Sequence, residues 1–205
     1  ILLVMSTAGW TTAADGFRSL PAPLHTTIWV VAALTMTFGN VLAVLQTSIK
    51  RTLAYSSVAH SGYMLVGVLA GPGLTFSGNG IAAVLFYLLC YGVMNLGAFA
   101  VIACLERRTL TGEFEEPDSI NDLRGLCQTH PLLGWIMVIS SVGLLGLPPL
   151  LGFLGKVPLF TAGIAAHHYV LVIILALNSA IPAYYYLRLA AFPLLETPEV
   201  APAQA

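Results

Sequence analysis

The sequence predicts an all-α membrane protein, and three observations support that prediction. Hydrophobic residues make up 58% of the 205 residues and charged residues only 8%, whereas soluble domains are about a quarter charged. Several apolar runs reach the roughly 20 residues that a helix needs to cross a bilayer. These runs are continuously apolar rather than alternating, which favours helices over the strands of a barrel. A net charge of −1 argues against a nucleic-acid partner and leaves the lipid bilayer as the expected surroundings.

The apolar runs predict one partial and five complete transmembrane helices. Residues 1–11 are interpreted as the tail of a preceding transmembrane helix, because no basic region or cleavage site marks them as a signal peptide. Clusters of turn-forming residues separate the later runs. The expected complete spans are residues 24–46, 53–70, 80–105, 131–163 and 169–188. Residues 24–190 therefore form a five-helix bundle, and residues 191–205 form a polar, Pro-rich tail.

The basic residues predict the orientation of this bundle, because successive loops must lie on alternate sides of the membrane. One side receives only Arg18. The other side receives Lys50, Arg51, Arg107, Arg108, Arg124 and Arg188. Cytoplasmic loops carry an excess of Lys and Arg, so the side with six basic residues is expected to be cytoplasmic.

The fourth complete span is expected to be discontinuous. At about 33 residues it is too long for one straight crossing. Pro148 and Pro149 lack N–H donors and clash with the preceding turn, so the helix should break at Leu147, Pro148 and Pro149. The expected arrangement is a half-helix at 131–143, an unwound stretch and a second half-helix that carries Lys156. Backbone groups freed at membrane depth must face protein or a water-filled cavity, and broken helices of this kind are common in transporters.

Lys156 is the one charged residue that falls well inside an apolar span. Desolvation favours the neutral form of a lysine, so a lysine at this depth can exchange a proton when water reaches it. The functional interpretation is therefore a proton relay. The alternative is that the long side chain snorkels to the outer membrane surface and has no role in transport.

His60 is the second candidate for the proton path. Ser56, Ser57, His60 and Ser61 lie three to four residues apart and are expected to share one helix face. A histidine there can pass a proton along a path lined by hydroxyl groups such as that of Ser57. The alternative is a neutral histidine that only hydrogen-bonds to a neighbouring helix.

Other residues in the spans are given structural roles. Asn40, Asn95 and Asn178 are expected to form hydrogen bonds between helices. Glycines are expected to let helices pack closely at Gly62, Gly67, Gly92 and Gly97. Pro182 should kink the last span. The three cysteines, Cys90, Cys104 and Cys127, fit neither a metal-binding nor a redox spacing.

Several stretches resemble a known family. "GNVLAVLQTSIKRTLAYSSVAHSGYMLVG" (39–67) resembles the antiporter-like membrane subunits of respiratory complex I. "AYSSVAHSGY" within it is most similar to subunit N of bacterial NADH-quinone oxidoreductase. "INDLRGL", "HPLLGWIMVISSVGLLGLPPLLGFLGK" and "LNSAIPAYYYLR" resemble the same subunit further on, so the likeness extends to about residue 190.

The resemblance implies more than the residues alone. In that family two inverted five-helix repeats lie within fourteen transmembrane helices, and this chain would be a C-terminal fragment with the second repeat. Lys156 would match the ionisable residue of the discontinuous helix twelve. The implied function is that of a proton-translocating membrane-arm subunit, which couples quinone reduction by NADH to proton pumping through a lysine-containing half-channel.

The resemblance also implies the setting. The chain would be part of an enzyme, NADH:quinone oxidoreductase, without a cofactor or redox centre of its own; the NADH, flavin, iron–sulfur and quinone sites would lie in other subunits. Its partners would be other membrane-arm subunits, in the inner (plasma) membrane of a bacterial cell. Two alternatives remain: a homologous subunit of a multisubunit cation/proton antiporter or membrane-bound hydrogenase, and a structural transmembrane scaffold without a transport role.

Overall fold

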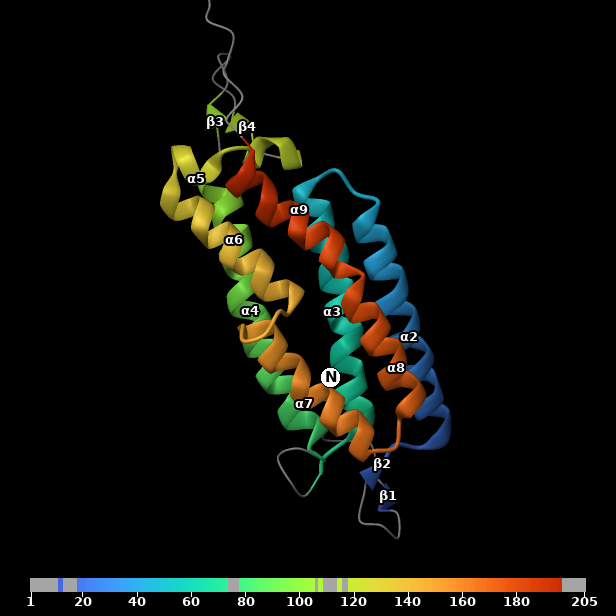
Figure 1. Cartoon of the computed structure of the whole chain (residues 1–205). Helices are drawn as coiled ribbons and strands as arrows, with labels where there is room; N and C mark the ends of the chain where they lie inside the picture. The colour runs from blue at the N-terminus through green and yellow to red at the C-terminus, as the bar shows by residue number, and fades with distance from the viewer. Residues whose placement is uncertain are drawn as a thin grey trace, which may run out of the picture.

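The structure, a computed structural model, describes residues 11–12, 18–73, 78–105, 107–108, 114–115 and 118–196. Long helices run side by side and form an elongated bundle (Figure 1). The long helices are α2 (Ala22–Val44), α3 (Ile49–Ala70), α4 (Gly80–Cys104), α6 (Pro131–Leu145), α7 (Leu151–Ala165), α8 (Tyr169–Ala180) and α9 (Pro182–Leu195). The short elements are β1 (Thr11–Thr12), β2 (Arg18–Ser19), β3 (Arg107–Arg108), β4 (Phe114–Glu115), η2 (Ile120–Leu123) and α5 (Leu126–Thr129).

Within the described residues, four helical stretches are long and apolar enough to cross a membrane: Ala22–Val44, Ile49–Ala70, Gly80–Cys104 and Tyr169–Leu195. Their outward faces carry large apolar side chains, such as Phe38 on α2 and Leu96 on α4, which are 60% and 71% exposed. Apolar surface of this extent fits lipid or a protein partner rather than water. The chain is therefore a multi-pass, mostly helical membrane protein.

The first three complete spans begin and end within a few residues of the expected positions. α3 starts earliest relative to expectation, at Ile49 instead of residue 53, because Ser48 caps it: the Ser48 hydroxyl accepts a hydrogen bond of 3.2 Å from the Arg51 N–H. At α4 the Asn79 side chain caps the first turn in the same way. Such caps satisfy backbone donors that the helix itself leaves unpaired.

The last span differs from the prediction at its end. The sequence predicted that it would end at residue 188 and that a polar tail would begin at 191, but α9 continues to Leu195. Leu189, Ala190 and Pro193 are buried, and α9 packs against α6, so tertiary packing extends the helix past the predicted end. The expected kink coincides with the interruption between α8 and α9 at Ile181, directly before Pro182.

The predicted tail of an earlier helix, residues 1–11, lies almost wholly outside the described residues. Thr11 itself is described, and it pairs with Ser19 in the β1–β2 hairpin rather than belonging to a helix. This hairpin lies at the end of the bundle opposite to β3 and α5 (Figure 1). The backbone of Arg18 is thus at one end, whereas that of Arg107, Arg108 and Arg124 is at the other, as the orientation argument requires.

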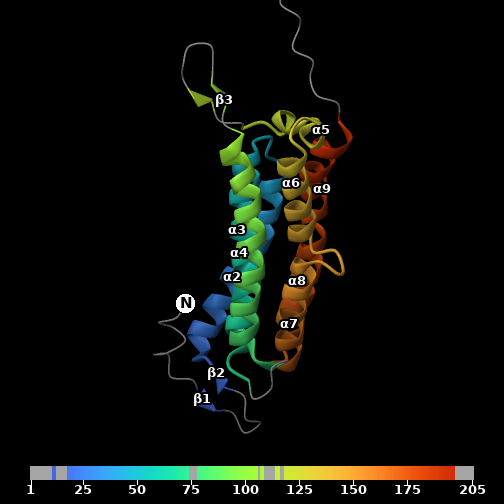
Figure 2. The same ribbon diagram turned by 90° about the vertical axis from the view of Figure 1, so that its left-hand side faces the viewer.

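The region predicted to be a broken span contains two shorter apolar helices, α6 and α7, which lie one above the other along the bundle (Figure 2). Gly146 has a φ of 87° and ends α6, a backbone conformation that glycine adopts readily. The interruption at residues 146–150 includes Leu147, Pro148 and Pro149. α6 ends at Leu145, two residues later than the predicted half-helix.

Candidate functional site

Lys156 lies on α7 and is 5% exposed. Its Nζ donates a hydrogen bond of 3.2 Å to the backbone carbonyl of Leu145, the last residue of α6. The same Nζ lies 5.5 Å from the centre of the Tyr63 ring. The last carbonyls of a helix have no partner within the helix, so the lysine satisfies one of them. The ammonium group therefore faces the interruption between α6 and α7, not the end of the bundle that snorkelling would require.

A cavity of about 200 Å³ opens beside Lys156. Its lining is Leu145, Gly146, Phe153, Lys156, Val157, Phe160 and Ser179. The lining includes the buried hydroxyl of Ser179, which has no hydrogen-bond partner among the described residues. A cavity of this volume has room for several water molecules, and the amine, the hydroxyl and the nearby carbonyl are polar partners for them.

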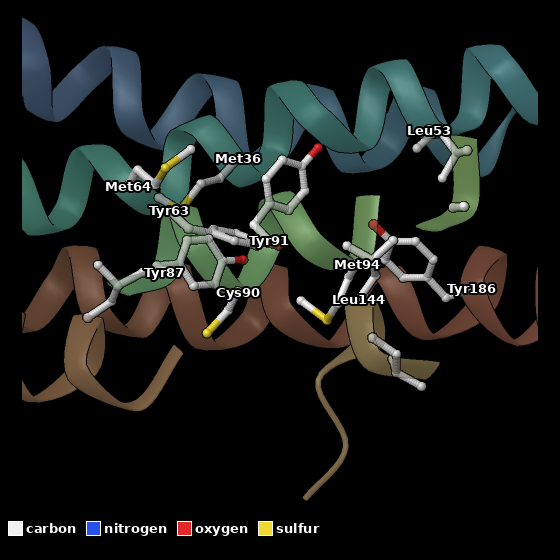
Figure 3. Close-up of a cluster of buried hydrophobic side chains, with 14 of the residues drawn as sticks. Met36, Leu53, Tyr63, Met64, Tyr87, Cys90, Tyr91, Met94, Leu144 and Tyr186 are labelled. Atoms are coloured by element: carbon white, nitrogen blue, oxygen red, sulfur yellow. The ribbon is translucent and has the colours of Figure 1, made fainter. Parts of the chain in front are cut away.

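His60 lies on α3, is 1% exposed and has a tyrosine at each ring nitrogen. Nδ1 is 2.5 Å from the Tyr87 hydroxyl and Nε2 is 3.2 Å from the Tyr186 hydroxyl. The Tyr186 hydroxyl also hydrogen-bonds to Ser56. Helices α3, α4 and α9 are thereby joined by the chain Ser56–Tyr186–His60–Tyr87, and Figure 3 shows both tyrosines in the buried cluster.

The predicted serine face around His60 is only partly correct. Ser56 joins the histidine through Tyr186, but Ser57 does not. The Ser57 hydroxyl donates to the Leu53 carbonyl and hydrogen-bonds to Tyr91 at 2.6 Å. Ser61 is exposed. Ser56 and Ser57 are adjacent on α3 and point about 100° apart, so Tyr186 reaches Ser56 whereas Tyr91 reaches Ser57. Ser57 therefore lies beside the His60 chain rather than in it.

A second buried network lies on the other side of Tyr63. The Tyr63 hydroxyl donates to the Asn178 carbonyl at 2.7 Å and accepts from Asn40 Nδ2 at 2.9 Å. Asn40 also donates to the Asn178 carbonyl and accepts from the Tyr185 hydroxyl. The predicted roles of Asn40 and Asn178 between helices are therefore confirmed.

Tyr63 lies close to both Lys156 and His60. Its ring is 5.5 Å from Lys156 Nζ and 5.3 Å from the His60 ring. No direct hydrogen bond between Lys156 and His60 occurs in the described part of the chain. The two predicted site residues are thus both brought close to the ring of Tyr63.

Two structural predictions on α4 are wrong. Asn95 is partly exposed and forms no hydrogen bond with the described residues, and a Cβ on Gly92 would meet nothing within 4 Å. Both lie toward the outer face of α4, which no helix among the described residues covers. Three glycines do pack closely, as predicted: Gly62 against α2, Gly67 against α4 and α7, and Gly97 against α6.

The sequence argument missed the buried tyrosines, which supply most hydroxyl groups of the site: Tyr63, Tyr87, Tyr91, Tyr185 and Tyr186. The spacing of the tyrosines in the sequence could have indicated this network. Tyr87 and Tyr91 are four residues apart, and Tyr185 and Tyr186 follow Pro182 in the run "PAYYYL". A buried tyrosine usually needs a hydrogen-bond partner, so such a concentration inside apolar spans indicates a polar network.

Comparisons with known proteins identify relatives of this chain. The family described as "NADH:quinone oxidoreductase/Mrp antiporter, TM" matches residues 1–182. NADH-quinone oxidoreductase subunit N of Salinibacter ruber is 47% identical over 77% of this chain and 30% of its own length. The subunit N of Trichlorobacter lovleyi is 44% identical over 84% of this chain and 33% of its own length. The chain thus spans about a third of the length of these relatives.

Solved structures give the same fold. A chain of respiratory complex I from Thermus thermophilus with bound aureothin superimposes with a TM-score of 0.70 at 35% identity, covering 85% of this chain and 37% of the other. A chain of the Mrp complex from Dietzia sp. superimposes with a TM-score of 0.73 at 27% identity, covering 88% and 32%. From the family match over most of its length and these relatives, the chain belongs to the NADH:quinone oxidoreductase/Mrp antiporter transmembrane family.

Proposed function

We propose that this chain is the part with the second five-helix repeat of a proton-translocating membrane-arm subunit of an NADH-quinone oxidoreductase in a bacterial plasma membrane. In this proposal α6 and α7 are the two halves of one discontinuous crossing, which brings the number of complete crossings to five. The observation that carries the proposal is the buried amine of Lys156, hydrogen-bonded to the end of α6 beside a cavity.

The surroundings of Lys156 suit proton exchange. A buried charge without a counter-ion is costly. Among the described residues, the groups near the Lys156 amine are a carbonyl, an aromatic ring and hydroxyl groups rather than a carboxylate. Water in the cavity can solvate the ammonium form or remove its proton. Both the protonated and the neutral form of Lys156 are therefore accessible, and small changes in its surroundings determine which form predominates.

The driving force comes from outside the chain in this proposal. The relatives are named as subunits of an oxidoreductase, and the matched residues make up only 30% and 33% of their length. The remaining part of the subunit would complete the path across the membrane. NADH, flavin, iron–sulfur and quinone sites would belong to partner subunits, whose redox chemistry changes the electrostatic field at Lys156.

The test is Lys156→Met in the full-length subunit within an assembled complex. Methionine keeps the length of the side chain without a titratable group. Protons pumped per NADH oxidised should fall, while NADH oxidation with an artificial electron acceptor stays unchanged. Unaltered pumping would overturn the proposed role and would favour a structural scaffold.

A second candidate is a subunit of a multisubunit cation/proton antiporter. The structural likeness to a chain of the Mrp complex supports it. Purifying the complex that contains this chain separates the two: NADH oxidation by the purified complex favours the first, and cation/proton exchange without NADH oxidation favours the second.

A further inference from the structure

A row of alternating aromatic and cationic side chains lies at the expected cytoplasmic end of α9. Tyr184, Arg188 and Phe192 are spaced four residues apart, so they share one face of the helix. The guanidinium carbon of Arg188 lies 5.5 Å from the centre of the Tyr184 ring. Arg124 follows η2 directly, and its guanidinium carbon lies 5.7 Å from the centre of the Phe192 ring. These four residues form the arginine–aromatic row.

Backbone contacts hold Arg124 against α9. The Gly125 N–H donates a hydrogen bond of 3.3 Å to the Phe192 carbonyl. The short helices η2 and α5, before and after Arg124, both pack against α9 (Figure 2). The Arg124 Nε is buried and has no hydrogen-bond partner in the described part of the chain. A buried donor without a partner costs free energy, so this nitrogen indicates an acceptor supplied from elsewhere.

Both arginines lack an acidic partner among the described residues, where neither guanidinium forms an ion pair with Asp or Glu. Asp122, the nearest acidic residue along the chain, accepts hydrogen bonds from the backbone N–H groups of Asp118 and Ser119 instead. The aromatic rings attract the two cations but do not neutralise them. The row therefore has two positive charges without a counter-ion, and its expected ligand is an anion.

Exposed apolar side chains lie beside the row on α9. They are Leu187, Leu194 and Leu195. On a membrane-spanning helix, an exposed apolar surface of this kind fits hydrocarbon chains. A ligand that combines an anionic group with apolar chains would therefore match both parts of this surface.

The row lies close to the depth of the lipid headgroups. The stretch Tyr169–Leu195 has 27 residues, which corresponds to about 40 Å of helix. The hydrocarbon core is only about 30 Å thick, so the ends of this stretch extend into the headgroup region. Phe192 lies within one turn of the end of α9. Arg188 lies about two turns from that end, and its long side chain can reach the headgroups from there.

We propose that the arginine–aromatic row binds the headgroup phosphate of an anionic phospholipid in the cytoplasmic leaflet. Phosphate oxygens accept hydrogen bonds from the two guanidinium groups, and the acyl chains lie along the exposed leucines of α9. A bidentate contact through Nε and a terminal nitrogen of Arg124 also supplies the partner that this Nε lacks. Basic residues at the cytoplasmic surface attract anionic lipids, which favours this leaflet as the source. The inference does not depend on proton exchange at Lys156.

The experiment identifies what contacts Leu187 in the full-length subunit within an assembled complex. Leu187 is replaced with the photo-crosslinking residue benzoylphenylalanine, and the complex is reconstituted in vesicles with equal amounts of phosphatidylglycerol and phosphatidylcholine. After illumination, mass spectrometry measures the adduct of each lipid at this position. Leu96 on α4 is the matched position, because it is also exposed and also lies about two turns from the end of its helix.

Phosphatidylglycerol adducts at Leu187 should exceed phosphatidylcholine adducts by about fivefold or more, because each basic residue near the membrane surface favours an anionic lipid by about this factor. The excess should disappear when Arg124→Gln and Arg188→Gln are combined. It should persist in Arg51→Gln, which removes an exposed charge from α3 at the same end of the bundle. Leu96 should show little preference between the two lipids.

Three results would overturn the proposal: equal adducts of the two lipids at Leu187, an excess that the combined arginine variant does not change, or a crosslink to another protein subunit in place of lipid. The comparison of Leu187 with Leu96 needs no arginine replacement. It therefore decides the question even if the combined variant does not assemble.

Discussion

Lys156 on α7 and Leu145 on α6 are joined by a hydrogen bond of 3.2 Å between the lysine amine and the backbone carbonyl. The interruption at residues 146–150 therefore has a polar side chain built into it, which replaces part of the lost helical hydrogen bonding. Both the packing around this interruption and the polar networks beside it lead to testable predictions.

The close approach of α7 to α6 should not tolerate a larger residue. A Cβ on Gly152 would collide with the Gly143 carbonyl oxygen. We expect Gly152→Ala to destabilise the protein by about 1–3 kcal/mol, the usual cost of overpacking. The measurement is thermal unfolding of the detergent-solubilised complex. Gly92→Ala is the matched control because its Cβ would meet nothing within 4 Å, and an equal loss of stability in both variants would contradict the packing described for the interruption.

Removing the amide of Asn40 should weaken the contact between α2, α3, α8 and α9. Asn40 bonds to Tyr63, Asn178 and Tyr185, so Asn40→Leu leaves three groups without this partner. Interhelical hydrogen bonds in membranes average about 0.6 kcal/mol each, so the expected loss of stability is about 1–2 kcal/mol. Thermal unfolding of Asn95→Leu provides the comparison, since Asn95 forms no hydrogen bond with the described residues and its replacement should be nearly neutral.

The hydroxyl of Tyr186 should matter for transport whereas that of Tyr184 should not. Tyr186 connects Ser56 to His60, and Tyr184 is 56% exposed. We therefore expect Tyr186→Phe to slow NADH-driven proton pumping by on the order of tenfold or more. Tyr184→Phe has the same chemical change and should keep the full rate. Equal rates for the two variants in assembled complexes would show that the His60 chain carries no protons.

His168, in the turn before α8, should make stability depend on pH. Burial lowers the pKa of His168 below 6.5, and the nearby His25 lowers this pKa further; the two rings are 5.0 Å apart. The Leu69 carbonyl raises the pKa and His167 lowers it. Because the folded pKa is below the unfolded value, the unfolded state binds more protons on acidification.

The stability contributed by His168 is therefore complete above about pH 6.5 and is lost as the pH falls from there toward the folded pKa. Thermal unfolding between pH 8 and pH 5 should show a loss of stability on the acidic side that is smaller in His168→Gln. An identical pH dependence in the two proteins would show that His168 does not titrate differently on folding.

The sequence was most informative where a single residue dictates the backbone or where apolar runs are long. Pro148 and Pro149 predicted the interruption, and the apolar runs predicted α2, α3 and α4 to within a few residues. Lys156 stood out because a charge inside an apolar run is rare. The end of α9 at Leu195 was missed, because packing against α6 rather than local composition stabilises its last turn.

The polar networks could be predicted only in part, because they depend on which helices are neighbours. The i, i+4 spacing of Ser56 and His60 was visible, but Tyr87 on α4 and Tyr186 on α9 approach His60 from distant parts of the chain. For the same reason the hydrogen bond between Ser57 and Tyr91 could not be predicted. Asn95 and Gly92 were assigned contacts that the described residues do not provide.

Lys156→Arg in the full-length subunit of the assembled complex tests the central claim most directly. Arginine keeps the positive charge and can still donate to the Leu145 carbonyl, but it does not lose its proton in proteins. If Lys156 carries protons, Lys156→Arg should reduce protons pumped per NADH as severely as Lys156→Met, although the complex assembles and oxidises NADH with an artificial acceptor. Normal pumping by Lys156→Arg would contradict the account, because a fixed charge at the helix interruption would then be sufficient.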